Sequence, residues 1–224
     1  MPLKDDNPTD SLPLVTLGII LANGAVFFHQ ITLDFPLSQR FLFQWAAVPY
    51  QITHGEILHV PPIIPLPLTL FSSMFLHGGF LHLLGNMLYL WIFGNNIEDR
   101  LGHFRFLLFY LLCGLLAAIL QISTDPDSTV PMIGASGAIA GILGGYLLLF
   151  PRAQVVTLVF IFIFIRILRL PALLILGFWF LVQVMSLGGG LTSNVAFFAH
   201  IGGFVSGLIL IKPFQPASRR GRRR

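Results

Sequence analysis

Long apolar runs with few charges constrain this chain more than any other feature. A helix that crosses a bilayer needs roughly 20 predominantly apolar residues, and six stretches approach that length: about 13–29, 76–95, 104–122, 133–150, 171–187 and 195–212. Only 10% of the 224 residues are charged, which is too few to cover the surface of a soluble domain of this length. The sequence therefore predicts an all-α, polytopic membrane protein with six transmembrane helices in one bundle.

The charges between the spans predict the orientation of the bundle. Six spans bring both termini to one side of the membrane, and that side receives Arg100, Arg105, Arg152, Arg166, Arg169, Lys212 and the arginines of 219–224. Arg40 is the only Lys or Arg on the other side, which receives the acids Asp34, Glu56, Asp125 and Asp127. The positive-inside rule then places both termini in the cytoplasm.

This orientation divides the chain into three regions. Residues 1–12 are expected to be a cytoplasmic segment, 13–212 the six-helix membrane domain and 213–224 a basic cytoplasmic tail. The first ten residues lack the basic region of a secretory signal, so the first span is expected to be uncleaved. We expect the tail to contact anionic lipid of the bilayer and not nucleic acid. The short chain and its basic tail are typical of a protein of the bacterial plasma membrane, which is the location we expect.

Two connections between the spans are unusual. Residues 30–75 are long for a loop and apolar, with the run Pro61–Pro67, which favours a structured loop that lies partly in the outer leaflet. Residues 155–165 are apolar but too short to cross a bilayer. We expect them to be re-entrant or interfacial, with Arg166 and Arg169 at the headgroups. Cys113, the single cysteine, is expected to be a buried packing thiol.

A serine and a histidine lie at membrane depth, where polar side chains are costly and therefore suspected of function. Ser136 lies in the sequence Gly-Ala-Ser-Gly at 134–137, and His200 lies in Ala-His-Ile-Gly-Gly at 199–203. Both spans enter from the outer side, which puts the two side chains at comparable depth. Glycines in both spans allow close helix contact, and a neighbouring neutral histidine can activate a serine hydroxyl as a nucleophile.

The remaining parts of such a site can also be predicted. None of the nine acidic residues lies deep in a span, so we predict a dyad of Ser136 and His200, with packing or water holding the imidazole. A developing oxyanion needs hydrogen-bond donors. The Ser136 N–H at a helix start is one candidate, and His82 and Asn86, which share one helical face, are two others. Each group alone also fits packing or an interhelical hydrogen bond.

Other chemistries find less support. The chain has no His-Glu-x-x-His motif, which argues against a zinc peptidase of that kind. No acid lies within a span, which argues against an aspartyl dyad. A small-solute transporter is favoured by composition alone, because the paired intramembrane charges typical of transporters are absent. No cofactor and no metal are expected.

The motifs together resemble those of the rhomboid intramembrane serine proteases over nearly the whole chain after its N-terminus. Besides the serine and histidine motifs, the matching residues are His82 with Asn86 and the segment Asn96-Ile97-Glu98-Asp99-Arg100-Leu101-Gly102. The resemblance implies a six-helix bundle with a water-filled cavity open to the outer face. It implies Ser136 as nucleophile, His200 as general base and then acid, and His82, Asn86 and the Ser136 N–H as the oxyanion hole.

The same resemblance implies a serine endopeptidase whose partners are transmembrane protein substrates, cut in or near a span. The fifth span, 171–187, and the loop after it, residues 188–194, resemble the mobile gate and cap of the family. Two positions depart from its pattern: many relatives have an aromatic residue where Ala140 stands, and some have a Trp-Arg pair where Leu68-Thr69 stands. An inactive rhomboid-like protein that binds membrane clients is the alternative, although the retention of both Ser136 and His200 argues against it.

Overall fold

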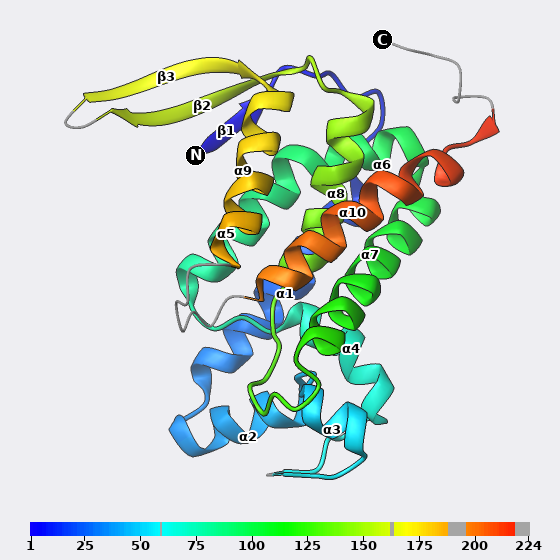
Figure 1. Cartoon of the computed structure of the whole chain (residues 1–224). Coiled ribbons are helices and arrows are strands. Elements are labelled where there is room, and N and C mark those ends of the chain that lie inside the picture. The colour runs from blue at the N-terminus through cyan, green and yellow to red at the C-terminus, as the bar shows by residue number, and fades with distance from the viewer. Residues whose placement is uncertain (59, 162–163, 188–195, 218–224) are drawn as a thin grey trace.

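Six apolar helices form the body of the protein in the computed structural model, which describes residues 1–58, 60–161, 164–187 and 196–217. They follow the six predicted runs in order (Figure 1). The second helix is continuous and contains a π-helical turn, η3 (Leu90–Gly94), between α5 (Phe80–Tyr89) and α6 (Asn95–Leu101). The other five are α1 (Leu14–Thr32), α7 (His103–Thr124), α8 (Ser136–Leu149), α9 (Ala172–Ser186) and α10 (Phe197–Phe214).

The helices differ in their ability to cross a membrane. Among the described residues, α1, α7 and α10 are long and apolar enough, and a fourth candidate pairs Phe80–Leu101 with the preceding Leu66–Phe75 piece, bent by 86°. The helix α8 has only 14 residues, which corresponds to about 21 Å at 1.5 Å per residue, against a hydrocarbon core of about 30 Å. A helix this short that starts at one surface ends inside the membrane.

The prediction of an all-α chain is wrong at one end of the bundle, where three antiparallel strands form a sheet. The order is β1 (Pro2–Asp5), β2 (Gln154–Ile161) and β3 (Phe164–Pro171). The described part of 155–165, predicted as a re-entrant or interfacial piece, thus belongs to strands β2 and β3, which pair and project sideways from the bundle (Figure 1). The run is rich in β-branched and aromatic residues, which favour strands, and periodicity alone does not distinguish a short apolar strand from a helix.

The Asn96–Gly102 motif anchors the N-terminal segment to the bundle. The fully buried carboxylate of Glu98 accepts hydrogen bonds of 2.8 Å from two N–H groups in the first turn of α1, those of Val15 and Thr16. Asp99 accepts from the backbone and hydroxyl of Ser11. Carboxylates at a helix N-terminus satisfy donors that have no intrahelical partner and complement the helix dipole. The motif therefore sets where the first span begins.

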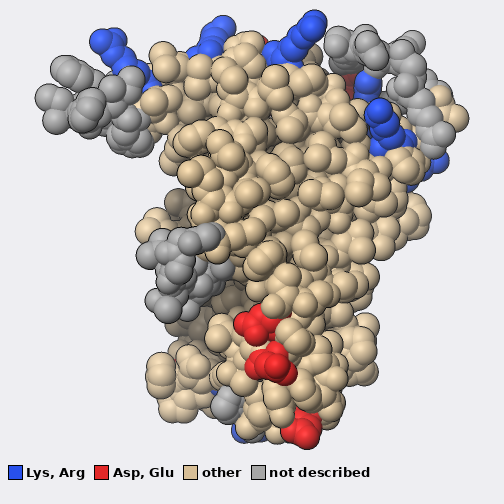
Figure 2. Space-filling model, in the orientation of Figure 1, with Lys and Arg blue, Asp and Glu red and all other residues tan. Residues whose placement is uncertain are grey.

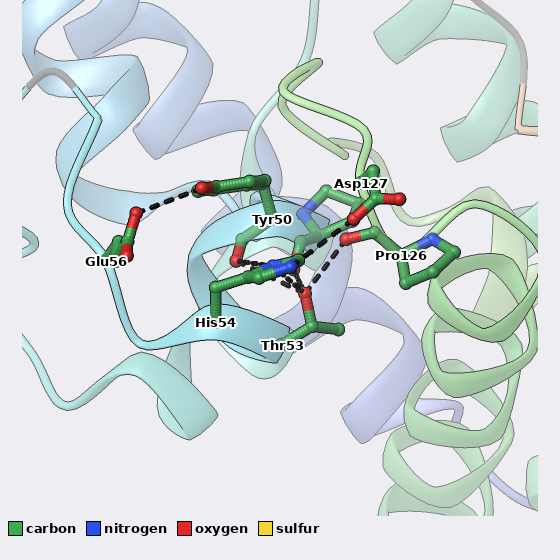
Figure 3. A network of polar contacts seen from close by, with 7 residues as sticks. Tyr50, Thr53, His54, Glu56, Pro126 and Asp127 are labelled. Carbon is green, nitrogen blue, oxygen red and sulfur yellow. Dashed lines mark hydrogen bonds and ion pairs between the residues drawn. The ribbon is translucent and has the colours of Figure 1, made fainter.

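The long connection between α1 and α5 is structured, as predicted. It contains α2 (Phe35–Trp45), α3 (Pro49–His54), η1 (Leu66–Leu68), α4 (Thr69–Ser72) and η2 (Ser73–Phe75). The end of α3 meets the connection between α7 and α8, where the Thr53 hydroxyl donates to the carbonyl of Pro126 and His54 lies 3.4 Å from the Asp127 carboxylate (Figure 3). These contacts brace the segment that leads into α8.

The two ends of the bundle differ in charge. Most of the Lys and Arg side chains visible in Figure 2 gather at the end that carries the sheet, whereas Asp and Glu on this face lie toward the other end. Arg152 follows α8, Arg166 and Arg169 belong to β3, and Lys212 lies in the last turn of α10. This asymmetry agrees with the charge distribution from which the orientation was predicted.

Glycines allow α8 and α10 to meet backbone to backbone at the centre of the bundle. A Cβ atom on Gly203 would collide with the carbonyl of Gly137, and one on Gly207 would collide with that of Gly141. The buried thiol of Cys113 fills the other side of Gly141, as expected for a packing cysteine. Close approach through small residues is the usual means of helix association in membranes.

The glycine contact predicts the outcome of a single methyl insertion. In Gly207→Ala the new methyl group meets backbone, which cannot rotate away, so we expect a loss of stability of at least about 1–3 kcal/mol. Gly24→Ala in α1 is the matched control, because a Cβ there has no atom within 4 Å. Thermal unfolding of the purified variants in detergent should show a lower midpoint for Gly207→Ala only. Equal midpoints would contradict this account of the contact.

Candidate active site

Ser136 begins α8 and is held there by the chain before it. The Met132 N–H donates to the carbonyl of Ala47 at 2.7 Å, and the Gly134 N–H donates to that of Ser73 at 2.9 Å. Gly134 has φ of +116°, a conformation that side chains disfavour and glycine adopts at little cost. The chain therefore turns sharply into α8, and Ser136 occupies its first turn, where N–H groups have no intrahelical acceptor.

The structure brings Ser136 and His200 into hydrogen-bond contact. His200 lies one turn into α10, and its Nε2 atom is 2.8 Å from the Ser136 hydroxyl oxygen. Both side chains are half-buried. The α8–α10 glycine contact lies directly below them, since Gly137 and Gly203 follow the two residues by one and three positions. The distance is within the range for transfer of a proton from the hydroxyl to the imidazole.

A third group near the imidazole was missed in the sequence. The Nδ1 atom of His200 lies 2.8 Å from Oε1 of Gln183, which is on α9 and only 8% exposed. The indole of Trp179, one turn earlier in α9, lies beside the imidazole with ring centroids 5.8 Å apart. The sequence predicted packing or water at this position, because the usual third group of a serine hydrolase is an acid and the spans contain none. A glutamine within an apolar helix is itself an indication of function.

Ala140 does not supply the aromatic support for the ring that the resemblance implies at this position. It is fully buried in the contact between α8 and α10, against the backbone of Gly203. The aromatic neighbour of His200 comes from α9 instead, in the form of Trp179. The departure from the family pattern therefore changes which helix supports the imidazole and leaves the contact with Ser136 in place.

His82 and Asn86 lie beside the backbone that precedes Ser136. A Cβ atom on Gly134 would be 2.9 Å from the His82 imidazole and 3.8 Å from the Asn86 amide nitrogen. His82 Nδ1 accepts a 3.4 Å hydrogen bond from the Gly78 N–H, which leaves its Nε2 as the protonated nitrogen. The Asn86 amide nitrogen is buried and has no hydrogen-bond partner within the described part of the chain. A buried donor without a partner calls for an explanation, and an oxyanion would be a suitable acceptor.

A small cavity opens beside the Ser136 hydroxyl. Its walls consist of small and apolar residues from several helices together with the backbone that leads into α8: Leu70, Ser73, Met74, Gly114, Ala117, Ala118, Met132, Ile133, Gly134, Gly137, Ala138, Ala196 and Ala199. An apolar space next to a nucleophile can hold one side chain of a substrate. The loop of the predicted gate and cap, residues 188–194, lies outside the described residues, whereas the helix before it is α9.

Taken together, these features define a polytopic helical membrane protein with a serine and a histidine in contact at membrane depth. Residues 67–215 match the model of the rhomboid domain, which covers more than half of the chain. The protein therefore belongs to the rhomboid family.

Rhomboid proteins from a plant and from bacteria are similar to this chain. "RHOMBOID-like protein 5" of Arabidopsis thaliana is 34% identical over 141 residues, which are 63% of this chain and 42% of that protein. "Rhomboid protease AarA" of Providencia stuartii is 35% identical over 144 residues (57% and 48%). "Rhomboid protease GluP" of Bacillus subtilis is 35% identical over 141 residues (62% and 24%). The chain thus spans less than half the length of each of these relatives.

The unpaired amide of Asn86 generates a prediction. If it stabilises an oxyanion, Asn86→Ala should lower kcat by about 10²–10³-fold with little change in stability. Asn23→Ala is the control, because Asn23 is also a buried asparagine in an apolar helix but donates to the carbonyl of Ile19 within α1. Hydrolysis of a membrane-anchored model substrate by both variants would measure the effect. An unchanged kcat in Asn86→Ala would assign Asn86 to packing.

Proposed function

We propose that the protein is an intramembrane serine endopeptidase that uses Ser136 and His200 to hydrolyse peptide bonds in or near transmembrane segments of membrane-anchored proteins. The observation that carries the proposal is the 2.8 Å contact between the Ser136 hydroxyl, at the start of α8, and His200 Nε2, in the first turn of α10. A hydroxyl paired in this way has a base within reach of its proton, which an isolated membrane serine lacks.

The first half of the reaction forms an acyl-enzyme. The Ser136 oxygen attacks the carbonyl carbon of the scissile bond while His200 Nε2 takes the hydroxyl proton. The carbonyl oxygen becomes an oxyanion, for which the Asn86 amide, His82 Nε2–H and the Ser136 N–H are the proposed donors. His200 then gives its proton to the amide nitrogen as the C–N bond breaks, and the amine product leaves.

Water completes the second half of the reaction. It attacks the ester carbon while His200 Nε2 takes one of its protons, and the C–O bond to Ser136 breaks as that proton returns to the serine oxygen. The short α8 supports access of water from the outer face, because a helix of about 21 Å whose C-terminal end lies at the cytoplasmic surface has its first turn, with Ser136, below the outer surface. The small, apolar cavity beside Ser136 would suit a small or apolar substrate side chain.

The proposed topology has six spans within residues 13–212, both termini in the cytoplasm and a basic tail at 213–224. It rests on the match between the apolar helices and the predicted runs, and on the gathering of Lys and Arg at the end that carries β1. The protein would then reside in a plasma membrane, with Ser136 toward its extracytoplasmic face. The bilayer and single-span substrates are its proposed partners.

Covalent labelling tests the proposal. A fluorophosphonate probe added to the folded protein in lipid should label Ser136, and a single-span model substrate in the same vesicles should be cleaved. Both activities should vanish in Ser136→Ala and fall by orders of magnitude in His200→Ala. Ser123→Ala should retain both, because Ser123 is an exposed serine whose hydroxyl donates to the carbonyl of Ile119 within α7. Folded wild-type protein that neither takes label nor cleaves would favour an inactive rhomboid-like protein that binds clients.

A further inference from the structure

One face of α9 makes two different contacts with the imidazole of His200. Trp179 and Gln183 are four residues apart, so their side chains lie one above the other on the helix. The indole packs against the ring at a centroid distance of 5.8 Å and an interplanar angle of 39°, and the glutamine oxygen lies 2.8 Å from Nδ1. The two contacts restrain both the plane and the rotation of the imidazole.

The orientation of the glutamine amide is set by a second contact. Its Nε2 donates to the carbonyl of Trp179 at 3.4 Å, which turns the amide oxygen toward His200. A carbonyl oxygen only accepts hydrogen bonds, so Nδ1 of His200 must be the protonated ring nitrogen. In a neutral imidazole the other nitrogen then carries the lone pair, and that nitrogen, Nε2, faces the Ser136 hydroxyl.

We propose that Gln183 is a positioning residue that holds His200 in the tautomer required of a general base, with Trp179 as the wall against which the ring packs. This inference rests on the proposed function of Ser136 and His200. The part played by a carboxylate in a soluble serine protease is taken here by a neutral amide. A neutral acceptor suits membrane depth, where an ionised carboxylate would be costly.

A neutral acceptor also has a chemical consequence. A carboxylate beside the imidazole would stabilise its protonated form, which cannot accept the serine proton. A neutral amide accepts the same hydrogen bond from Nδ1 but does not stabilise the protonated imidazole in this way. Among the described residues, the hydrogen-bond partners of the His200 imidazole are the Gln183 amide and the Ser136 hydroxyl, and neither is a carboxylate.

The test compares the kcat of two substitutions. Which of the two variants is faster depends on whether Gln183 positions His200 or only packs. Gln183→Met keeps the volume and removes the acceptor, and we expect kcat to fall about 10- to 100-fold with KM nearly unchanged, because Nδ1–H is left buried without a partner. Gln183→Glu keeps the acceptor, so its kcat near the optimal pH should exceed that of Gln183→Met. The acidic limb of its pH–rate profile should move to higher pH. If the residue only packs, the charged side chain should be the worse of the two.

A matched control comes from a second glutamine that contacts α10. Gln121 on α7 accepts a 3.2 Å hydrogen bond from the Ala199 N–H and has no hydrogen bond to the imidazole of its neighbour. Gln121→Met should therefore change thermal stability as Gln183→Met does but leave kcat within about threefold and the pH–rate profile unmoved. Equal kcat in Gln183→Met and wild type, or a lower kcat in Gln183→Glu than in Gln183→Met with an unmoved profile, would overturn the proposal.

A measurement on the unsubstituted protein keeps the test independent of variant folding. Nitrogen NMR of ¹⁵N-histidine-labelled protein in lipid, with His200 assigned by comparison with His200→Ala, should report Nδ1 as the protonated nitrogen. The opposite tautomer would refute the role of Gln183 whether or not the enzyme is active. Absence of fluorophosphonate labelling in wild type would instead count against the proposed function.

Discussion

The contact between the backbones of α8 and α10 is the interaction on which the rest of this structure depends. Glycines at 137 and 203, and again at 141 and 207, let the two helices approach until a single methyl group would not fit. Helices in a membrane gain little from the hydrophobic effect when they associate, so close packing must supply the attraction. The same approach places a serine on one helix within 2.8 Å of a histidine on the other. Stability and the geometry of the site therefore have one origin.

The third helix of the site, α9, has a different relationship to this core. It contributes the ring and the amide that contact His200, yet much of its surface is exposed, including Leu173, Leu174 and Phe178. The serine and the histidine are thus held by a rigid glycine contact, whereas the orientation of the imidazole depends on a less buried helix. Small movements of α9 would change the tautomer or tilt of the ring before they changed the distance between the two main helices.

Much of this fold could be predicted from the sequence, because six apolar runs separated by charges admit few arrangements in a bilayer. Ser136, His200, His82 and Asn86 could be singled out because polar groups at membrane depth are rare and these four fall at one level. The β2–β3 hairpin could not, since a short apolar run rich in Val, Ile and Phe has the same hydropathy as a helix segment. Gln183 was missed because soluble serine hydrolases orient histidine with an acid, and only the fold reveals that an amide from α9 reaches Nδ1.

The lengths of the helices explain how the proposed hydrolytic site could receive water. A nucleophile buried in a full-length span would meet lipid and neighbouring helices but no water. Here α8 has 14 residues and its first turn carries Ser136, while the chain before it is held by backbone hydrogen bonds to Ala47 and Ser73 in the connection between α1 and α5. Irregular backbone at membrane depth is tolerated where protein surrounds it or where it lines a hydrated cavity. The structured connection between α1 and α5 thus satisfies the backbone that leads into α8, and a small cavity that this backbone lines lies beside Ser136.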